Sequence, residues 1–317
     1  MDALKALLHQ IYPELLADGF VESHKRLSMT ELQAFGIEFG SHSVSSMLHG
    51  GDLWFKGDLE TTAFELIEHG FRVGLPTRLH SPQHHLRVHH RVAVFDIVPG
   101  QQTPDGPVPE WHITDIISQT DLLRLLWAKM DILAPQDSAY DIQIAQLKAG
   151  LHRQTPELVS LSPDTPTLSA LAKMHKAHVS GAAVVQHTPN GPLLGNLSAS
   201  DLRGLTPERF GALALSVGAF LLYKHPKYGD DSVVKGNLTY EDALLDALPP
   251  EVKEGRWTEA LAGAVQLVTC SESTTLGQII ELMVQHGVHR VYVCDPSTNS
   301  PTGVVTPTDV LRWILLY

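Results

Sequence analysis

Three stretches of the chain share one pattern: IISQTDLL at residues 116–123, NLSASDLR at 196–203 and VVTPTDVL at 304–311. In each, an apolar stretch runs into Ser/Thr-x-Ser/Thr-Asp, and apolar residues at helical spacing begin there. A repeat at this scale indicates a chain built from copies of one unit, and that repetition decides the fold class.

The last copy shows the unit most clearly. Residues 266–270 are a short β-type run and 271–275 are turn and cap material. Apolar residues then recur at helical spacing up to Gly287, which ends the predicted helix. Residues 288–294 and 303–305 are typical of strands, and 307–316 of a helix. The predicted order is strand, helix, strand, strand, helix.

The middle copy has the same order, with strands at 158–161, 179–185 and 193–197, a helix at 165–176, and a helix that opens at Asp201. Leu168 and Leu276 are 108 residues apart, and so are Asp201 and Asp309. The shared offset supports an internal duplication.

The first copy is longer. It has a predicted strand at 52–55, a helix from Leu59 to 69, and strands at 71–76 and 91–98. Leu59 and Asp121 are 62 positions apart, against 33 for the matching residues of the other copies. The extra length includes a His-rich segment, 80–90, and a segment rich in Gly and Pro, 99–109, which predicts a loop.

These patterns predict an α+β protein with six parts. They are a helical extension at 1–42, a first unit at 43–127 with an insertion at about 78–110, a linker helix at 128–150, a second unit at 151–205, a helical spacer at 206–265, and a third unit at 266–317. The spacer includes a predicted helix of small residues that starts at 210 and runs through Phe220.

Composition excludes several classes of protein. The net charge of −12 argues against a surface for nucleic acid or anionic membrane. The longest apolar run, 210–223, is shorter than the roughly 20 residues that span a bilayer. Only two cysteines are present and the N-terminus does not resemble a secretory signal, so we expect a reducing compartment, the cytoplasm, with the nucleus as the alternative.

The repeated unit resembles the cystathionine β-synthase (CBS) domain. Residues 287–295 (GVHRVYVCD) with 303–309 (GVVTPTD) are similar to the final CBS unit of the gamma subunit of AMP-activated protein kinase and its fungal and plant relatives. Residues 179–185 with 195–201 resemble the unit before it, and 55–74 resemble the opening unit. The resemblance implies β-α-β-β-α units whose paired sheets are flanked by helices, a Bateman module. Gamma subunits carry four units in two pairs, so three units leave the first without an evident partner.

The Asp that closes each Ser/Thr-x-Ser/Thr-Asp ending has two possible interpretations. The structural one is a helix start, in which Ser118, Ser198 or Thr306 is the N-cap and Asp121, Asp201 or Asp309 reaches back as in a capping box. The functional one adds a ligand: a carboxylate at a helix N-terminus can accept both hydroxyls of a ribose, and the resemblance implies that role. The neighbouring hydroxyl groups, on Thr120, Ser200 and Thr308, and exposed backbone N–H groups can hold phosphate.

A basic pair on the preceding strand favours the functional reading for the last unit. His289 and Arg290 are either solvated charges or phosphate contacts, and the resemblance favours contacts. The middle unit lacks them, since Ser180-Gly181 or Gly181-Ala182 stands there, and its pocket would need to borrow His289 or Arg290. In the first unit Arg72 is the candidate and Arg91 its competitor.

Other chemistry is weakly indicated. The spacing of His80, His84, His85, His89 and His90 would suit a metal on a helix, but Pro82 disfavours a helix there, and a solvent-exposed loop is the preferred interpretation. Walker-type, His-Glu-x-x-His and Gly-x-Ser-x-Gly signatures are missing from the sequence. An enzyme is therefore not predicted, and neither is a cofactor.

Two hypotheses follow. The first is a regulatory module that binds an adenine nucleotide (AMP, ADP or ATP) between CBS units and transmits its occupancy to a partner, such as a protein kinase complex or its scaffold subunits. The second is a CBS scaffold without ligand that acts in protein–protein interaction. A homodimer would give the odd unit a mate.

Overall fold

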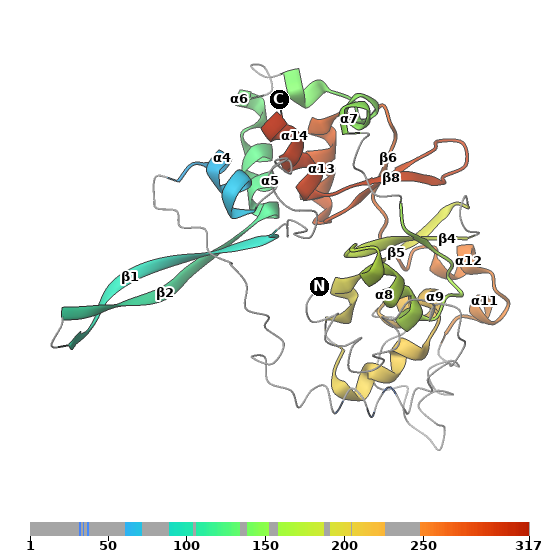
Figure 1. Ribbon diagram of the computed structural model, residues 1–317. Coiled ribbons are helices and arrows are strands. Elements are labelled where there is room, and N and C mark those ends of the chain that lie inside the picture. Colours follow the sequence, from blue (N-terminus) through green and yellow to red (C-terminus); the bar gives the residue numbers. More distant parts are fainter. Residues whose placement is uncertain are drawn as a thin grey trace. The chain divides into compact units, whose positions relative to one another are not determined.

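The structure is a computed structural model that describes residues 61–71, 89–103, 106–133, 138–151, 158–186, 191–203, 205–225 and 248–316, together with Leu32, Ala34 and Ile37 (Figure 1). The chain divides into two compact units. Unit 1 comprises Met1–Gly51, Pro156–Leu267 and Cys294–Gly303, and unit 2 comprises Asp52–Thr155, Val268–Val293 and Val304–Tyr317. The predicted helix near the N-terminus, the strand at 52–55, residues 72–76 of the strand predicted at 71–76, and His80, His84 and His85 lie outside the described residues.

The last repeat has the predicted order of elements. These are β6 (Thr269–Cys270), α13 (Leu276–His286), β7 (Val291–Cys294), β8 (Pro301–Val305) and α14 (Pro307–Leu316). Thr275 and Gln278 form a capping box at the start of α13, and Gly287 ends it with a left-handed φ of 62°. Local signals at both ends of the helix thus fix its limits.

The middle repeat begins in the same way, with β3 (Ser160–Leu161), α8 (Thr167–Lys176), β4 (Gly181–Val185) and β5 (Leu193–Ser198). In both of these repeats the short first strand runs parallel to the second. The prediction of a helix at Asp201 is wrong, because η5 (Ala199–Leu202) is a single 3-10 turn. The spacer helix is also two elements, since Leu215 is extended between η6 (Pro207–Ala214) and α9 (Val217–Tyr223), which Ser216 caps.

The first repeat differs most from its prediction. Its first helix is α4 (Ala63–Glu65) continued as the π-type turn η3 (Leu66–Gly70). The predicted loop at 99–109 is wrong, because β1 (Arg91–Thr103) and β2 (Gly106–Ser118) form an antiparallel ribbon, followed by α5 (Gln119–Ala128). Pro99 lies opposite Pro109 in the ladder. Proline has no N–H to give, but both strands of a two-stranded ribbon are edges, where a missing donor is tolerated.

The predicted linker helix at 128–150 is also wrong. It is replaced by α6 (Met130–Leu133), η4 (Ser138–Asp141) and α7 (Ile144–Leu151). Pro135 stands just after α6, and a proline both lacks the helical donor and disfavours helical backbone at the residue before it.

The first repeat has a mate within the chain, which the sequence did not reveal. In unit 2 a buried cluster joins Ile67 and Phe71, of η3 and the residue after it, and Leu122 and Leu123 of α5 to residues of the last repeat: Ile279, Ile280, Met283, Val310, Leu311 and Trp313. The first repeat therefore needs no second copy of the chain to supply its mate.

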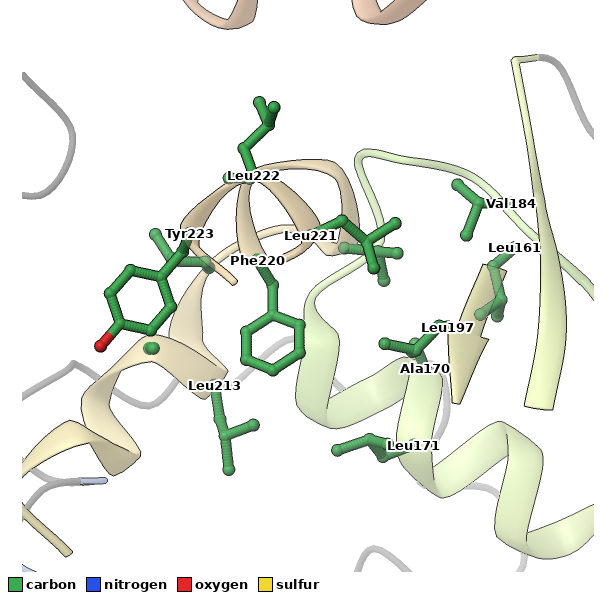
Figure 2. Close-up of a cluster of buried hydrophobic side chains, with 14 of the residues drawn as sticks. Leu161, Ala170, Leu171, Val184, Leu197, Leu213, Phe220, Leu221, Leu222 and Tyr223 are labelled. Carbon is green, nitrogen blue, oxygen red and sulfur yellow. The ribbon is translucent and has the colours of Figure 1, made fainter. Parts of the chain in front are cut away.

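The middle repeat packs against the spacer in unit 1. Figure 2 shows Phe220 of α9 pointing into the space between Leu213 of η6 and the α8 residues Ala170 and Leu171. The short helices α11 (Pro250–Lys253) and α12 (Trp257–Leu261) complete this part. No helix in the described ranges is long and apolar enough to cross a membrane.

The two units dock their accessory helices in the same way. In unit 2, Leu276 N donates to Ile142 O (3.0 Å) and Ile144 N donates to Thr274 O (3.0 Å). In unit 1, Thr167 N donates to Leu215 O (2.9 Å) and Val217 N donates to Thr165 O (2.8 Å). Each reciprocal pair of backbone hydrogen bonds joins the starts of two helices. Helix α7 in unit 2 and helix α9 in unit 1 therefore occupy equivalent positions.

A glycine allows α12 to approach α9. A Cβ built on Gly218 would lie 2.4 Å from the Trp257 ring, whose indole N–H donates to Asp164 Oδ1 at 2.8 Å. We expect Gly218→Ala to lower the free energy of unfolding by about 1–3 kcal/mol, as overpacking does. Chemical denaturation measures this loss. In a Trp257→Ala background the same substitution should lose most of its effect, and an undiminished effect there would contradict the contact as its cause.

Candidate functional site

All three repeated endings are capping boxes or close variants of them. Ser118 N and Oγ donate to Asp121 Oδ2 at 2.9 and 2.6 Å, and Thr306 N and Oγ1 donate to Asp309 Oδ2 at 2.9 and 2.6 Å. Ser198 N donates to Asp201 Oδ2 at 2.7 Å. The predicted capping role of the three carboxylates is thereby confirmed, and each of these bonds uses Oδ2.

The endings of the first and last repeats meet in unit 2. Thr120 Oγ1 lies 3.2 Å from His289 Nδ1, within hydrogen-bond distance, and Thr308 Oγ1 donates to Gln119 Oε1 at 2.9 Å. Gln119 and Thr120 are buried in these contacts, and His289 is exposed. The pairing of α5 with α13 and α14 thus brings Thr120 of the first repeat beside His289 and Gln119 beside Thr308 of the last repeat.

The strand register decides what stands at the position of the basic pair in the middle repeat. Thr269 pairs with Tyr292, and Ser160 pairs with Ala183. Counting back two and three residues, Gly181 takes the place of Arg290 and Ser180 that of His289. Of the two alignments left open by the sequence, the register supports the one that includes Ser180.

The same register identifies a second basic pair, in the first repeat. Arg91 lies opposite Ser118 as Gly181 lies opposite Ser198, and Gln119 N donates to His90 O (3.1 Å) as Ala199 N donates to Ser180 O (2.9 Å). His90-Arg91 therefore occupies the place of His289-Arg290. Arg91, not Arg72, holds this strand position, and Arg72 lies outside the described residues.

A signal for this second pair is present in the sequence. HRVAVFD at 90–96 and HRVYVCD at 289–295 are identical at five of seven positions. The insertion hides the match, because residues 71–76 directly follow the first helix of the repeat and are themselves typical of a strand. His90 was therefore not among the predicted contacts of a ligand.

The middle ending lies in unit 1 and has a different surrounding. Ser198 Oγ donates to Ser180 O at 3.3 Å, and Ser200 Oγ donates to Ser198 Oγ at 2.8 Å. No Arg or His stands at its strand positions 180 and 181, so this ending offers hydroxyl groups and a carboxylate where the other two repeats also offer cations.

The electrostatics of the unit 2 site follow from these neighbours. Desolvation lowers the pKa of His90, a hydrogen bond with Gln119 opposes that shift, and the positive charges of Arg290 and Arg91 lower it further. Hydrogen bonds from Ser118 lower the pKa of Asp121, whereas burial raises the pKa of Asp309 despite its Thr306 bonds. The site therefore holds like charges close together and one carboxylate that is costly to ionise.

These groups can bind but suggest no reaction. Arg and His donors suit phosphate oxygens, and a helix-start carboxylate suits paired hydroxyls. Across the ranges that the structure describes, no group of three or more His, Cys, Asp or Glu residues could hold a metal ion. His89 and His90 are the part of the His-rich segment within those ranges, and His89 O accepts from Gln119 Nε2 at 3.0 Å.

Asp121 and Asp309 predict opposite effects of pH on stability. A folded-state pKa below the ordinary 3.8 means that Asp121 stabilises the fold above that pH and loses its contribution as the pH falls. A raised pKa means that Asp309 contributes below that pH and loses its contribution as the pH rises. Relative to the unchanged protein, Asp121→Asn should therefore be most destabilised near pH 7, whereas Asp309→Asn should gain stability between about pH 4 and pH 7. Denaturation at a series of pH values tests this, and slopes of the same sign for both variants would contradict it.

The CBS domain family model matches residues 153–207 and 262–316, which are the middle and last repeats. Protein SDS23 of Kluyveromyces lactis is 31% identical over 219 residues, covering 63% of this chain and 36% of that protein. Protein SDS23 of Yarrowia lipolytica is 25% identical over 197 residues, 62% of this chain and 33% of that protein.

A further relative is the SNF1-related protein kinase regulatory subunit gamma-1-like of Arabidopsis thaliana, 27% identical over 166 residues, 51% of this chain and 30% of that protein. The chain spans about a third of the length of these relatives. Among solved structures, protein MJ1225 of Methanocaldococcus jannaschii, described as a putative archaeal homolog of g-AMPK, aligns with a TM-score of 0.38 and 18% identity over 64% of this chain and 55% of that one. The chain thus contains a pair of CBS domains, at 153–207 and 262–316, in an α+β fold of small sheets flanked by helices.

Proposed function

We propose that this protein is a non-catalytic regulatory module that binds an adenine nucleotide between the first and last repeats of unit 2. The observation that carries the proposal is the convergence of two His-Arg pairs, His90-Arg91 and His289-Arg290, at the place where the two endings meet. Burial is the main cause of the lowered pKa of His90, and the charge of Arg290 of the last repeat adds to it.

Each chemical part of a nucleotide has a candidate partner in this site. Arg290 and Arg91 offer planar donor forks to phosphate oxygens, and His289 adds a ring nitrogen beside the Thr120 hydroxyl. Asp309 and Asp121, at the starts of α14 and α5, would accept the ribose hydroxyls. Because the caps use Oδ2, Oδ1 of Asp309 is the oxygen we assign to ribose.

The middle repeat would contribute less to nucleotide binding. Asp201, Ser198, Ser200 and Ser180 could hold a ribose, but Gly181 stands where the other repeats have arginine. His289 lies within hydrogen-bond distance of Thr120 of the first repeat, so we assign it to the unit 2 site. No catalytic residue and no cofactor belong to this function, in which the nucleotide is the regulatory ligand.

The last repeat connects the proposed ligand site in unit 2 covalently to unit 1. Arg290 directly precedes β7, and the following segment, 294–303, belongs to unit 1, where Leu193 N donates to Asn299 O at 2.9 Å. A ligand that favours one arrangement of paired repeats shifts the population toward it. The Arabidopsis relative is by name a protein kinase regulatory subunit, and on that likeness we propose a kinase complex in the cytoplasm or nucleus as the partner.

A scaffold without ligand is the second candidate, and the caps favour it. Asp121, Asp201 and Asp309 all have a structural use, and the Thr308 hydroxyl is already donated to Gln119. In that case nucleotide would neither bind nor change the association with a partner protein.

Calorimetry separates the two candidates. We expect the full chain to bind AMP, ADP or ATP, and Arg290→Ala and Arg91→Ala each to weaken binding about 10- to 100-fold, since a charged hydrogen bond contributes about 1.5–3 kcal/mol. Arg256→Ala is the matched control, because it removes an arginine of unit 1 that pairs with Glu254 and Glu259. That variant should bind as the unchanged protein does.

Two outcomes would contradict the proposal. One is a folded protein that binds no nucleotide at millimolar concentration. The other is equal weakening by Arg256→Ala and Arg290→Ala, which would indicate a general effect of charge. Thermal melts of each variant confirm that it is folded.

A further inference from the structure

The side chain of Gln119 joins the first and last repeats of unit 2 through an amide of defined orientation. Gln119 is 3% exposed, and its Nε2 donates to His89 O at 3.0 Å. Because a backbone carbonyl only accepts hydrogen bonds, the nitrogen of the amide must face His89. The atom that faces the last repeat is therefore the amide oxygen, and Thr308 Oγ1 donates to it at 2.9 Å.

Two contacts with His90 hold the same glutamine in place. Its backbone N donates to His90 O at 3.1 Å. Burial lowers the pKa of His90, and a hydrogen bond with the Gln119 side chain opposes that shift. A bond that favours the protonated ring has the ring as its donor, so the amide oxygen must be the acceptor. Both lone pairs of Oε1 are then used, and the amide cannot turn over without losing these contacts.

The capping motif does not require a glutamine at this position. The matching residues of the middle and last endings are Ala199 and Pro307, whose side chains can neither donate nor accept. Both of those endings nevertheless have their caps. The use of the Gln119 side chain therefore lies in its contacts with the neighbouring strand and with Thr308.

The contact with Gln119 determines what Thr308 can offer a ligand. A hydroxyl group has one hydrogen to donate and two lone pairs that accept. The hydrogen of Thr308 is donated to Gln119, so toward a ligand this hydroxyl can only accept. The oxygens of an ionised phosphate also only accept, whereas a sugar hydroxyl can donate. Thr308 therefore suits a sugar hydroxyl, a different role from the phosphate contact expected from the sequence.

We infer, on the basis of the proposed function, that Gln119 is a positioning residue that holds the Thr308 hydroxyl as an acceptor, so that Thr308 and Asp309 form the ribose end of the site. The two residues are adjacent in the first turn of α14, and both are partly exposed. Oδ1 of Asp309, which the cap does not use, also accepts. Two acceptors then stand side by side for the two adjacent hydroxyl groups of a ribose.

The contact between Thr120 and His289 has the opposite polarity. Whichever of Thr120 Oγ1 and His289 Nδ1 donates across their 3.2 Å separation, the pair retains a second N–H or O–H group. Together with Arg290, these groups are donors that suit phosphate oxygens. The hydroxyl groups of Thr120 and Thr308 thus serve different parts of one nucleotide, and Gln119 is the residue that makes them differ.

Calorimetry of the full chain with AMP and ATP, each beside its 2′-deoxy and 3′-deoxy analogues, tests the ribose end. The unchanged protein should bind the ribonucleotide about 2- to 10-fold more tightly than the analogue that lacks the hydroxyl bound by Thr308. Thr308→Val keeps the shape of the side chain and removes the acceptor. This variant should bind the ribonucleotide about 2- to 10-fold more weakly and that analogue with unchanged affinity.

Gln119→Met tests the positioning role, because it keeps the length of the side chain and removes its hydrogen bonds. The preference for the ribonucleotide should fall to that of Thr308→Val, and in a Thr308→Val background the same substitution should leave the preference unchanged. A loss of stability alone does not alter the ratio of two affinities measured on one folded variant. Thr114→Val, at an exposed threonine of β2, is the matched control and should keep the full preference.

Three outcomes would overturn the inference and leave the proposed function in place. One is equal binding of the ribonucleotide and both analogues by the unchanged protein. The second is equal weakening of all three ligands by Thr308→Val, which would indicate a phosphate contact. The third is equal weakening by Gln119→Met, which would indicate a purely structural glutamine. A folded protein that binds none of these ligands at millimolar concentration would overturn the proposed function as well, and thermal melts show that each variant is folded.

Discussion

The apolar contact between α5 and the helices α13 and α14 determines what unit 2 can do. Leu122 and Leu123 of α5 are buried in the same cluster as Ile279, Ile280, Val310 and Leu311 of the last repeat. Because α5 and α14 each begin at a Ser/Thr-x-Ser/Thr-Asp ending, packing the helices together also brings the endings together. The polar contacts between Thr120 and His289 and between Gln119 and Thr308 therefore depend on an interaction in which no polar group takes part.

The same capping motif has three different surroundings. Asp121 is exposed enough to pair with Arg124 at 2.9 Å, and its pKa falls, whereas burial raises the pKa of Asp309. Asp201 has a cap but no basic pair on its strand. Local sequence thus determines that a carboxylate caps the turn, while the packing around it determines whether it stays charged and what it can meet.

Predictions from the sequence were correct where the signals are local and wrong where they depend on distant partners. The limits of α14 and the Gly287 end of α13 follow from a proline, a cap and a glycine. The loop predicted at 99–109 relied on composition alone. Composition cannot distinguish a loop from an edge strand, in which proline is tolerated. The pairing of the first with the last repeat involves residues far apart in the chain, and no local pattern encodes it. The alignment of His90-Arg91 with His289-Arg290 is visible as a local sequence match, but the insertion in the first repeat hides it.

Burial is the main cause of the lowered pKa of His90 in unit 2, and nearby positive charge adds to it. In a chain of net charge −12, two arginines and two histidines lie where the first and last repeats join, and the charges of Arg290 and Arg91 disfavour a charge on His90. Like charges held together weaken the contact between the elements that carry them. An anion bound there would relieve that repulsion only while the first and last repeats are packed together. The free energy of anion binding would therefore depend on that packing. If the proposed nucleotide binds there, electrostatics alone would couple its binding to the arrangement of the two repeats.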